Sequence, residues 1–167
     1  MLDSLITSKT RIRLLVKFFV SAANRGHMRG LAEEFNESTN AIRKELNNLS
    51  EAGYLEKQAD QNRVTYRANV SHPLFGSLQN IVRKYLGLDT IVETVLGRMG
   101  DVEQVVLTGD YAEGRDSGTI KVTIVGNQLN EEYLEQLAPK VEGVIGRKVV
   151  FTLQQGAPAG GLVIYER

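Results

Sequence analysis

Residues 39–52 constrain the fold of this chain more than any other segment, because their pattern predicts a helix with two opposite faces. Ile42, Leu46 and Leu49 follow one another at steps of four and three residues, so they share one apolar face. The opposite face is polar and basic and carries Asn40, Arg43, Lys44 and Asn47. Ser38 is suited to cap the helix at its first turn. Such a helix rests its apolar face on other helices and presents its polar face to solvent or to a partner.

The surrounding pattern predicts a small helical core followed by a hairpin. Residues 9–23 form a predicted helix whose basic side chains, Lys9, Arg11, Arg13 and Lys17, lie on its outer face. Gly26 is expected to end that helix as a left-handed cap. Residues 29–35 form a second helix, a polar turn precedes Ser38, and residues 54–68 read as a β-hairpin with Arg63 near its tip.

The polar face at residues 39–52 has the chemistry of a DNA-reading helix. Arginine can donate two hydrogen bonds to guanine, asparagine can pair with adenine, and lysine can reach a phosphate. A merely solvated helix face is the alternative, but asparagine is a poor helix former and this face uses it at positions 40, 47 and 48. The pattern therefore favours a nucleic-acid interface.

Residues 28–56 contain Leu-Ala in the second helix, then a polar turn, and finally Gly-Tyr-Leu-Glu before the hairpin. This pattern resembles winged helix-turn-helix transcriptional regulators of the ArsR-like and MarR-like type. The resemblance covers about residues 8–70. It implies binding to double-stranded DNA through Arg29, Thr39, Asn40, Arg43, Lys44, Asn47 and Arg63. Metal sensing through cysteine, known in some ArsR-like proteins, does not carry over because the chain has no cysteine.

The charge of the chain is divided between its halves. Residues 1–88 hold 13 Lys and Arg against 8 Asp and Glu, a net charge of +5, whereas residues 89–167 hold 7 against 12, a net charge of −5. A basic first half suits phosphate, and an acidic second half would be repelled by it. The two histidines have no metal-site spacing, so no metal and no cofactor are expected. The chain lacks a long apolar run and a signal-peptide pattern, so we expect a cytoplasmic protein with no membrane partner.

The second half predicts a small α/β domain, so the fold class is α+β. Helices are expected at residues 74–86, 89–99 and 130–142, and strands at residues 102–107, 119–125, 148–153 and 161–165. The predicted organisation is a winged helix domain at residues 1–72, a linker helix at residues 73–88 and an α/β domain at residues 89–167.

The glycine-rich segment at residues 109–126 resembles the nucleotidyltransferases of the DNA polymerase β type. Aligned on Gly109, Ala112, Gly114 and Gly126, the two metal-binding aspartates of that family fall on Thr119 and Lys121. Neither side chain can replace a carboxylate on Mg²⁺. The resemblance thus implies an inactive scaffold with no catalytic residue, although Asp110 and Asp116 stand nearby. An unrelated α/β domain with a glycine-rich hairpin is the alternative.

These observations predict a DNA-binding regulator that forms a homodimer, with the second domain used for dimerisation or for a nucleotide or sugar-nucleotide effector. Such an effector would bind at Gly109, Asp110, Gly114 and Arg115. An active nucleotidyltransferase that docks its substrate on the winged domain is the alternative function, and a protein-interaction module is a third.

Overall fold

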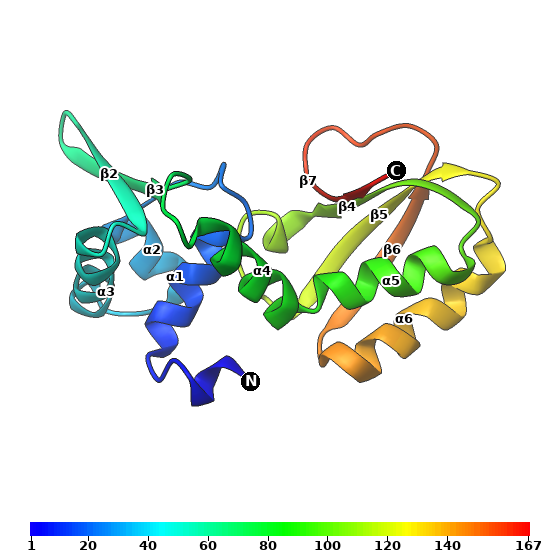
Figure 1. The fold of residues 1–167 in the computed structure, drawn as a ribbon, viewed down its shortest axis with the longest axis horizontal. Helices are drawn as coiled ribbons and strands as arrows, with labels where there is room; N and C mark the ends of the chain where they lie inside the picture. The colour runs from blue at the N-terminus through cyan, green and yellow to red at the C-terminus, as the bar shows by residue number, and fades with distance from the viewer. The chain divides into compact units, whose positions relative to one another are not determined.

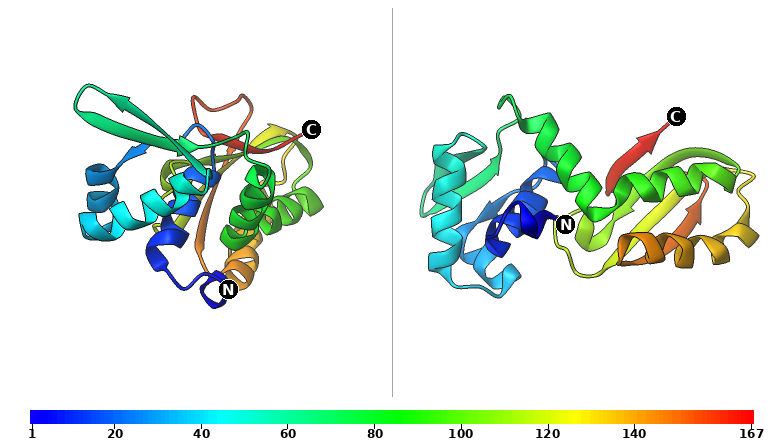
Figure 2. Two further views of the ribbon diagram at one scale, coloured as in Figure 1. Left: turned by 60° about the vertical axis from the view of Figure 1, so that its left-hand side comes forward. Right: turned by 60° about the horizontal axis from the view of Figure 1, so that its bottom comes forward.

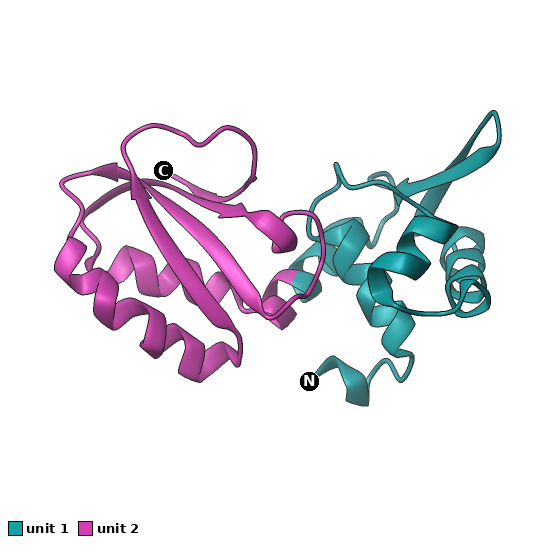
Figure 3. Ribbon diagram, turned by 180° about the vertical axis from the view of Figure 1, so that it is seen from behind, with its two compact units in different colours: residues 1–82 teal, residues 83–167 magenta.

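The computed structural model describes residues 1–167 and divides into two compact units, Met1–Val82 and Arg83–Arg167 (Figure 3). It is a mixed α+β structure with six helices and two sheets (Figure 1). The boundary falls inside helix α4 (Phe75–Leu86), within the segment that the sequence predicts as a linker helix. No helix has the length and apolar character needed to cross a bilayer.

Unit 1 is a three-helix core with a hairpin that projects beyond it (Figures 1 and 2). Its elements are η1 (Leu2–Ser4), α1 (Lys9–Phe19), β1 (Gly26–His27), α2 (Met28–Phe35), α3 (Thr39–Glu51), β2 (Leu55–Asp60), β3 (Arg63–Ala68) and the first part of α4. Helices α1 and α2 both pack against α3, and Phe18, Ile42 and Leu46 are fully buried at this junction. The three strands form an antiparallel sheet in the order β1-β3-β2.

The turn between α2 and α3 and its Ser38 cap lie where the sequence predicts them. Asn36 ends α2 in the left-handed conformation, with φ of 52°, which asparagine tolerates better than most residues. The Ser38 side chain then accepts a hydrogen bond from the Ala41 backbone N–H at 3.2 Å and caps the first turn of α3. The buried residues of α3 include Ile42, Leu46 and Leu49, so the apolar face is confirmed.

Three predictions about α1 and its exit are wrong. The helix ends at Phe19 rather than at residue 23, because the Asn24 side chain donates to the Lys17 carbonyl at 2.8 Å and the chain turns away. Gly26 is no left-handed cap; it opens β1, opposite Tyr66 of β3. Lys17 is buried rather than exposed, because it is paired with Glu34 of α2.

Unit 2 is a four-stranded sheet with two helices on one face (Figures 1 and 3). Its elements are the end of α4, α5 (Leu88–Arg98), β4 (Asp101–Thr108), η2 (Gly109–Tyr111), β5 (Thr119–Asn127), α6 (Glu131–Ile145), β6 (Lys148–Gln154) and β7 (Leu162–Glu166). The strand order is β6-β5-β4-β7, with β5 and β6 parallel and the other pairs antiparallel. Helix α6 connects the parallel pair, as a crossover between parallel strands requires.

Candidate nucleic-acid interface

The polar face of α3 lies on the surface of unit 1. Its exposed side chains include Thr39, Asn40, Arg43, Lys44 and Asn47. The Arg43 guanidinium donates to the Asn40 side-chain oxygen at 2.9 Å, and neither Arg43 nor Lys44 has an acid within ion-pair distance. The face therefore combines side chains that can hydrogen-bond to base edges with positive charge that the protein itself does not neutralise.

Three of the four basic residues of α1 are paired inside the unit instead. Arg11 pairs with Glu45 of α3 at 2.7 Å, Arg13 pairs with Glu37 in the α2–α3 turn at 2.7 Å, and Lys17 pairs with Glu34 of α2 at 3.0 Å. Glu45 is buried and also accepts from the Ser8 hydroxyl at 3.1 Å. These three pairs link α1 to α2, to α3 and to the turn between them, and they leave Lys9 as the one cation of α1 without an acid partner.

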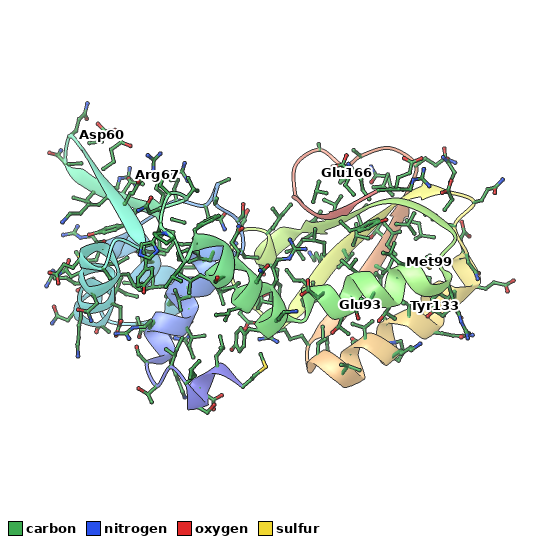
Figure 4. All side chains as sticks on the ribbon, in the orientation of Figure 1. Asp60, Arg67, Glu93, Met99, Tyr133 and Glu166 are labelled. Carbon is green, nitrogen blue, oxygen red and sulfur yellow. The ribbon has the colours of Figure 1, made fainter.

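The hairpin β2–β3 is the second exposed basic element of unit 1. Figure 4 shows Asp60 at the tip of the hairpin and Arg67 closer to the helices. Arg67 is paired with Glu56 across the strands at 3.0 Å, whereas Lys57 and Arg63 make no ion pair. Arg63, the first residue of β3, instead approaches the His27 ring, with its Nη1 atom 3.4 Å from Nδ1.

The cations of unit 1 thus fall into two groups. Four are paired with acids, on α1 and at the base of the hairpin. Seven have no acid partner within 4.0 Å: Lys9, Arg25, Arg29, Arg43, Lys44, Lys57 and Arg63. Five of these seven lie on α2, α3 and the hairpin, the elements that the sequence predicts to contact DNA. Arg29 is exposed in the first turn of α2.

The predicted ligand loop of unit 2 is closed on itself. Arg115 lies 3.1 Å from the Asp110 carboxylate and 2.9 Å from that of Glu113. The backbone N–H groups of residues 112–115 all donate to carbonyl oxygens of residues 109–111. Gly109 and Gly114 have φ of 70° and 82°, so glycine serves the tight turn at both positions. Four backbone N–H donors of the loop are therefore already hydrogen-bonded, which argues against a phosphate-binding loop. Ligand binding by Gly109, Asp110, Gly114 and Arg115 stays a prediction.

Asp116 is held in a structural cluster of unit 2. The Arg147 guanidinium contacts both of its carboxylate oxygens, at 3.0 and 2.7 Å, and the hydroxyl of the fully buried Tyr111 donates to it. The Gly118 N–H donates to the same hydroxyl at 2.8 Å. Burial and the Asp116 carboxylate raise the pKa of Tyr111 to about 12. The hydrogen bonds from Arg147 to Asp116 raise the pKa of that guanidinium further above its usual value.

The two positions aligned with the family's metal ligands lie on β5. Ile120 and Val122 are buried, whereas Thr119 and Lys121 alternate with them and share the other face, with Lys121 exposed. Asp110 is paired with Arg115, and Asp116 with Arg147. Nowhere in the chain do three or more His, Cys, Asp or Glu side chains gather in a way that could hold a metal ion.

No pattern in the sequence indicated that His27 contacts the hairpin. This histidine lies in β1, a two-residue strand too short to have a periodic pattern, so its approach to the hairpin could not be foreseen. The Tyr111–Asp116–Arg147 cluster was also missed, because its members are up to 36 residues apart and come from separate turns. The one available signal was the position of Arg147 directly after Gly146, at the end of α6.

Among solved structures, this chain is similar to the transcriptional regulator BldR from Sulfolobus solfataricus. The match covers 59% of this chain and 69% of the BldR chain, at 15% sequence identity and a TM-score of 0.40. Human N-acetylserotonin methyltransferase is similar over 57% of this chain and 32% of its own, at 12% identity and a TM-score of 0.32. The sequence matches no family model and no curated protein. At these scores neither likeness assigns a function to this chain.

Proposed function

We propose that this chain is a DNA-binding transcriptional regulator whose unit 1 binds duplex DNA as a winged helix-turn-helix. The observation that carries the proposal is the distribution of unpaired charge: three of the four cations of α1 are neutralised inside the unit, whereas five of the six cations of α2, α3 and the hairpin have no acid partner. Positive charge that the fold leaves unpaired is available to phosphates. On α3 it stands beside asparagine and arginine side chains that can read base edges.

In this proposal α3 enters the major groove and the hairpin follows the adjacent backbone. Asn40, Arg43 and Asn47 read bases, while Lys44 and the wing residue Arg63 contact phosphate. Thr39 and Arg29 lie in the first turns of their helices and contact the phosphate backbone of the DNA. The ion pair of Arg11 with the buried Glu45 supports the function indirectly, because it fixes α3 on α1.

The experiment that tests this proposal compares two charge-matched double variants on duplexes selected from a random pool. Arg43→Ala with Lys44→Ala removes two unpaired cations from α3, and Arg98→Ala with Lys140→Ala removes two exposed, unpaired cations from α5 and α6. The first double variant should bind about tenfold more weakly or worse, since a lost base contact costs about 1–3 kcal/mol. The second should bind like the unaltered chain. Equal effects, or no duplex recovered from the pool, would reject DNA binding through α3.

We further propose that unit 2 does not catalyse nucleotidyl transfer. That reaction needs carboxylates that hold Mg²⁺ against the triphosphate. The two aligned positions carry Thr119 and Lys121, and the nearby Asp110 and Asp116 are engaged by arginines. Labelled nucleoside triphosphates with Mg²⁺ or Mn²⁺ and candidate acceptors should give no transfer above background. Metal-dependent labelling abolished by Asp110→Asn or Asp116→Asn would make the enzyme the better account.

We also propose a homodimer, because one recognition helix reads too few base pairs to select an operator and paired half-sites are the usual solution. A stripe on α4 supports it. Leu74, just before the helix, and Ile81 within it are 46% and 40% exposed, and Leu78 lies between them at helical spacing. Unit 2 is then free to bind an effector or to strengthen the dimer.

A further inference from the structure

The His27 ring joins the start of α2 to the wing of unit 1. It lies in β1, directly before α2, and its Nδ1 atom is 3.4 Å from the Nη1 atom of Arg63. We propose that His27 is a positioning residue that holds the Arg63 guanidinium ready for a DNA phosphate. This inference rests on the proposed DNA binding of unit 1 and assigns the means by which the wing is preorganised.

The register of the small sheet brings the two residues together. His27 stands opposite Thr65 in the antiparallel pair of β1 and β3. Arg63 is two residues from Thr65, so its side chain leaves β3 on the same face and is the diagonal neighbour of His27. A long arginine side chain spans that diagonal easily. Strand pairing therefore places the two side chains within reach of each other.

Gly30 makes room for the ring on the other side. A Cβ atom at this position would lie 2.7 Å from His27 Cε1 and 3.0 Å from Nε2, far closer than side-chain atoms normally approach. The ring thus rests on the bare backbone of the first turn of α2. His27 occupies the N-cap position of α2, yet its side chain makes no capping hydrogen bond. Its remaining polar contact is with Arg63.

The chemistry of the pair fixes the role of each partner. A guanidinium only donates hydrogen bonds, so Nδ1 is the acceptor in this contact, which requires the tautomer that carries its ring proton on Nε2. The contact uses one of the five N–H groups of Arg63, and no acid competes for the others. An arginine held in this way loses less side-chain freedom when it binds a phosphate, and this raises affinity.

Three variants distinguish the contribution of the Nδ1 acceptor of His27 from that of its aromatic ring. His27→Phe keeps an aromatic ring but removes the acceptor, and His27→Asn keeps an acceptor close to the Nδ1 position without the ring. Gly30→Ala leaves both partners and all charges unchanged but occupies the space under the ring. Since alanine favours a helix more than glycine, this variant should not weaken α2. Thermal unfolding of all three is measured alongside.

The first readout needs no DNA. Nitrogen-15 relaxation of the Arg63 side-chain Nε–H should show an ordered guanidinium in the unaltered protein and in His27→Asn, and a mobile one in His27→Phe and Gly30→Ala. An Arg63 side chain that is equally mobile in the unaltered protein and in His27→Phe would overturn the positioning role, whether or not the protein binds DNA.

The second readout is a double-mutant cycle on DNA affinity. His27→Phe should weaken binding about three- to tenfold, the loss expected when one long side chain must be immobilised on binding. In an Arg63→Ala background the same substitution should have no further effect. Additive losses would mean that His27 acts independently of Arg63 and would overturn the proposal. Failure of the unaltered protein to bind any duplex, with an ordered Arg63, would instead reject the proposed function while leaving the contact itself established.

Discussion

Arg43 and Arg63, two of the unpaired arginines of unit 1, are held by different neighbours. Arg43 is on α3, where it donates to the Asn40 side chain at 2.9 Å, and Arg63 is at the start of β3, beside His27. A side chain in the middle of the polar face of a recognition helix faces base edges. A side chain near the tip of a wing faces phosphates or the minor groove. Substitution of each residue should therefore change DNA affinity in a different way.

Arg43→Ala should reduce sequence discrimination, whereas Arg63→Ala should weaken binding to all sequences alike. The loss for Arg43→Ala should be about 1–3 kcal/mol on the selected site and small on scrambled DNA, because only the selected site offers the base contact. Competition titrations with selected and scrambled duplexes measure both. If Arg43→Ala lowers affinity equally for the two duplexes, Arg43 contacts the backbone and the assignment of the two residues is reversed.

Tyr111 predicts how unit 2 responds to alkali. Its pKa is raised to about 12 in the folded protein, against 10.0 in an unperturbed tyrosine, because burial and Asp116 disfavour the phenolate. The unfolded chain therefore loses this proton at lower pH than the folded one. The contribution of the protonated Tyr111 to the free energy of unfolding is complete below pH 10.0 and is lost as the pH rises toward about 12. Tyr111→Phe lacks the group, so the difference in unfolding free energy between the two proteins should shrink over that range. Chemical unfolding of both proteins at several pH values tests this, and a constant difference would contradict it.

At the scale of elements, helix α4 has two apolar faces. Val82 and Leu86 are buried within the chain, and the Phe75 ring lies 5.8 Å from that of Phe19. The stripe of Leu74, Leu78 and Ile81 lies elsewhere on the helix and is partly exposed. The N-terminal part of α4 carries no charge, and Arg83 and Lys84 stand in its last turn. An antiparallel pair of α4 helices would keep these like charges apart, which favours a second copy as the partner.

The element-scale prediction is that polar substitution of this stripe dissociates the dimer. Sedimentation of the unaltered protein at micromolar concentration should give twice the 18.5 kDa of one chain. Leu74→Gln with Ile81→Gln should give single chains that retain their thermal stability, because both side chains are already exposed. Leu96→Gln on α5 is the matched control, since Leu96 is also 40% exposed and lies off the stripe. A single-chain mass for the unaltered protein would contradict the dimer.

The strand edges of unit 2 show how the sheet avoids uncontrolled pairing. The order β6-β5-β4-β7 leaves β6 and β7 at the edges. The Glu142 carboxylate accepts from the Val149 N–H of β6 at 3.1 Å, and the Arg83 guanidinium donates to the Ile164 carbonyl of β7 at 2.6 Å. Each edge strand thus has one backbone group occupied by a charged side chain, a protection that edge strands commonly need.

Periodic elements could be predicted from the sequence, and contacts between them could not. The two-faced pattern of α3 and the capping by Ser38 are local, so both were correctly expected. The end of α1 depends on a hydrogen bond from Asn24, and the burial of Lys17 depends on Glu34, a residue of another helix. The exposure of the α3 face was predictable for the same local reason, but the approach of His27 to Arg63 required the pairing of β1 with β3.

At the scale of the whole molecule, charge separates the two units. Unit 1, residues 1–82, holds 11 Lys and Arg against 8 Asp and Glu, a net charge of +3, and unit 2, residues 83–167, holds 9 against 12, a net charge of −3. Within unit 1, internal pairs neutralise three of the four cations of α1, and five of the seven cations that stay unpaired lie on α2, α3 and the hairpin. DNA binding by this protein should then be driven by release of counterions from phosphates, and it should depend on salt through unit 1.

The salt dependence of DNA affinity tests the central claim most directly. With roughly 4–6 phosphate contacts per chain, the logarithm of the binding constant should fall against the logarithm of salt concentration with a slope of about −4 to −5 per chain. Titration of a labelled duplex at several salt concentrations measures this slope. Arg43→Ala with Lys44→Ala should make it less steep, while Arg98→Ala with Lys140→Ala should leave it unchanged. Affinity that does not change with salt, or no binding at any salt concentration, would contradict the account.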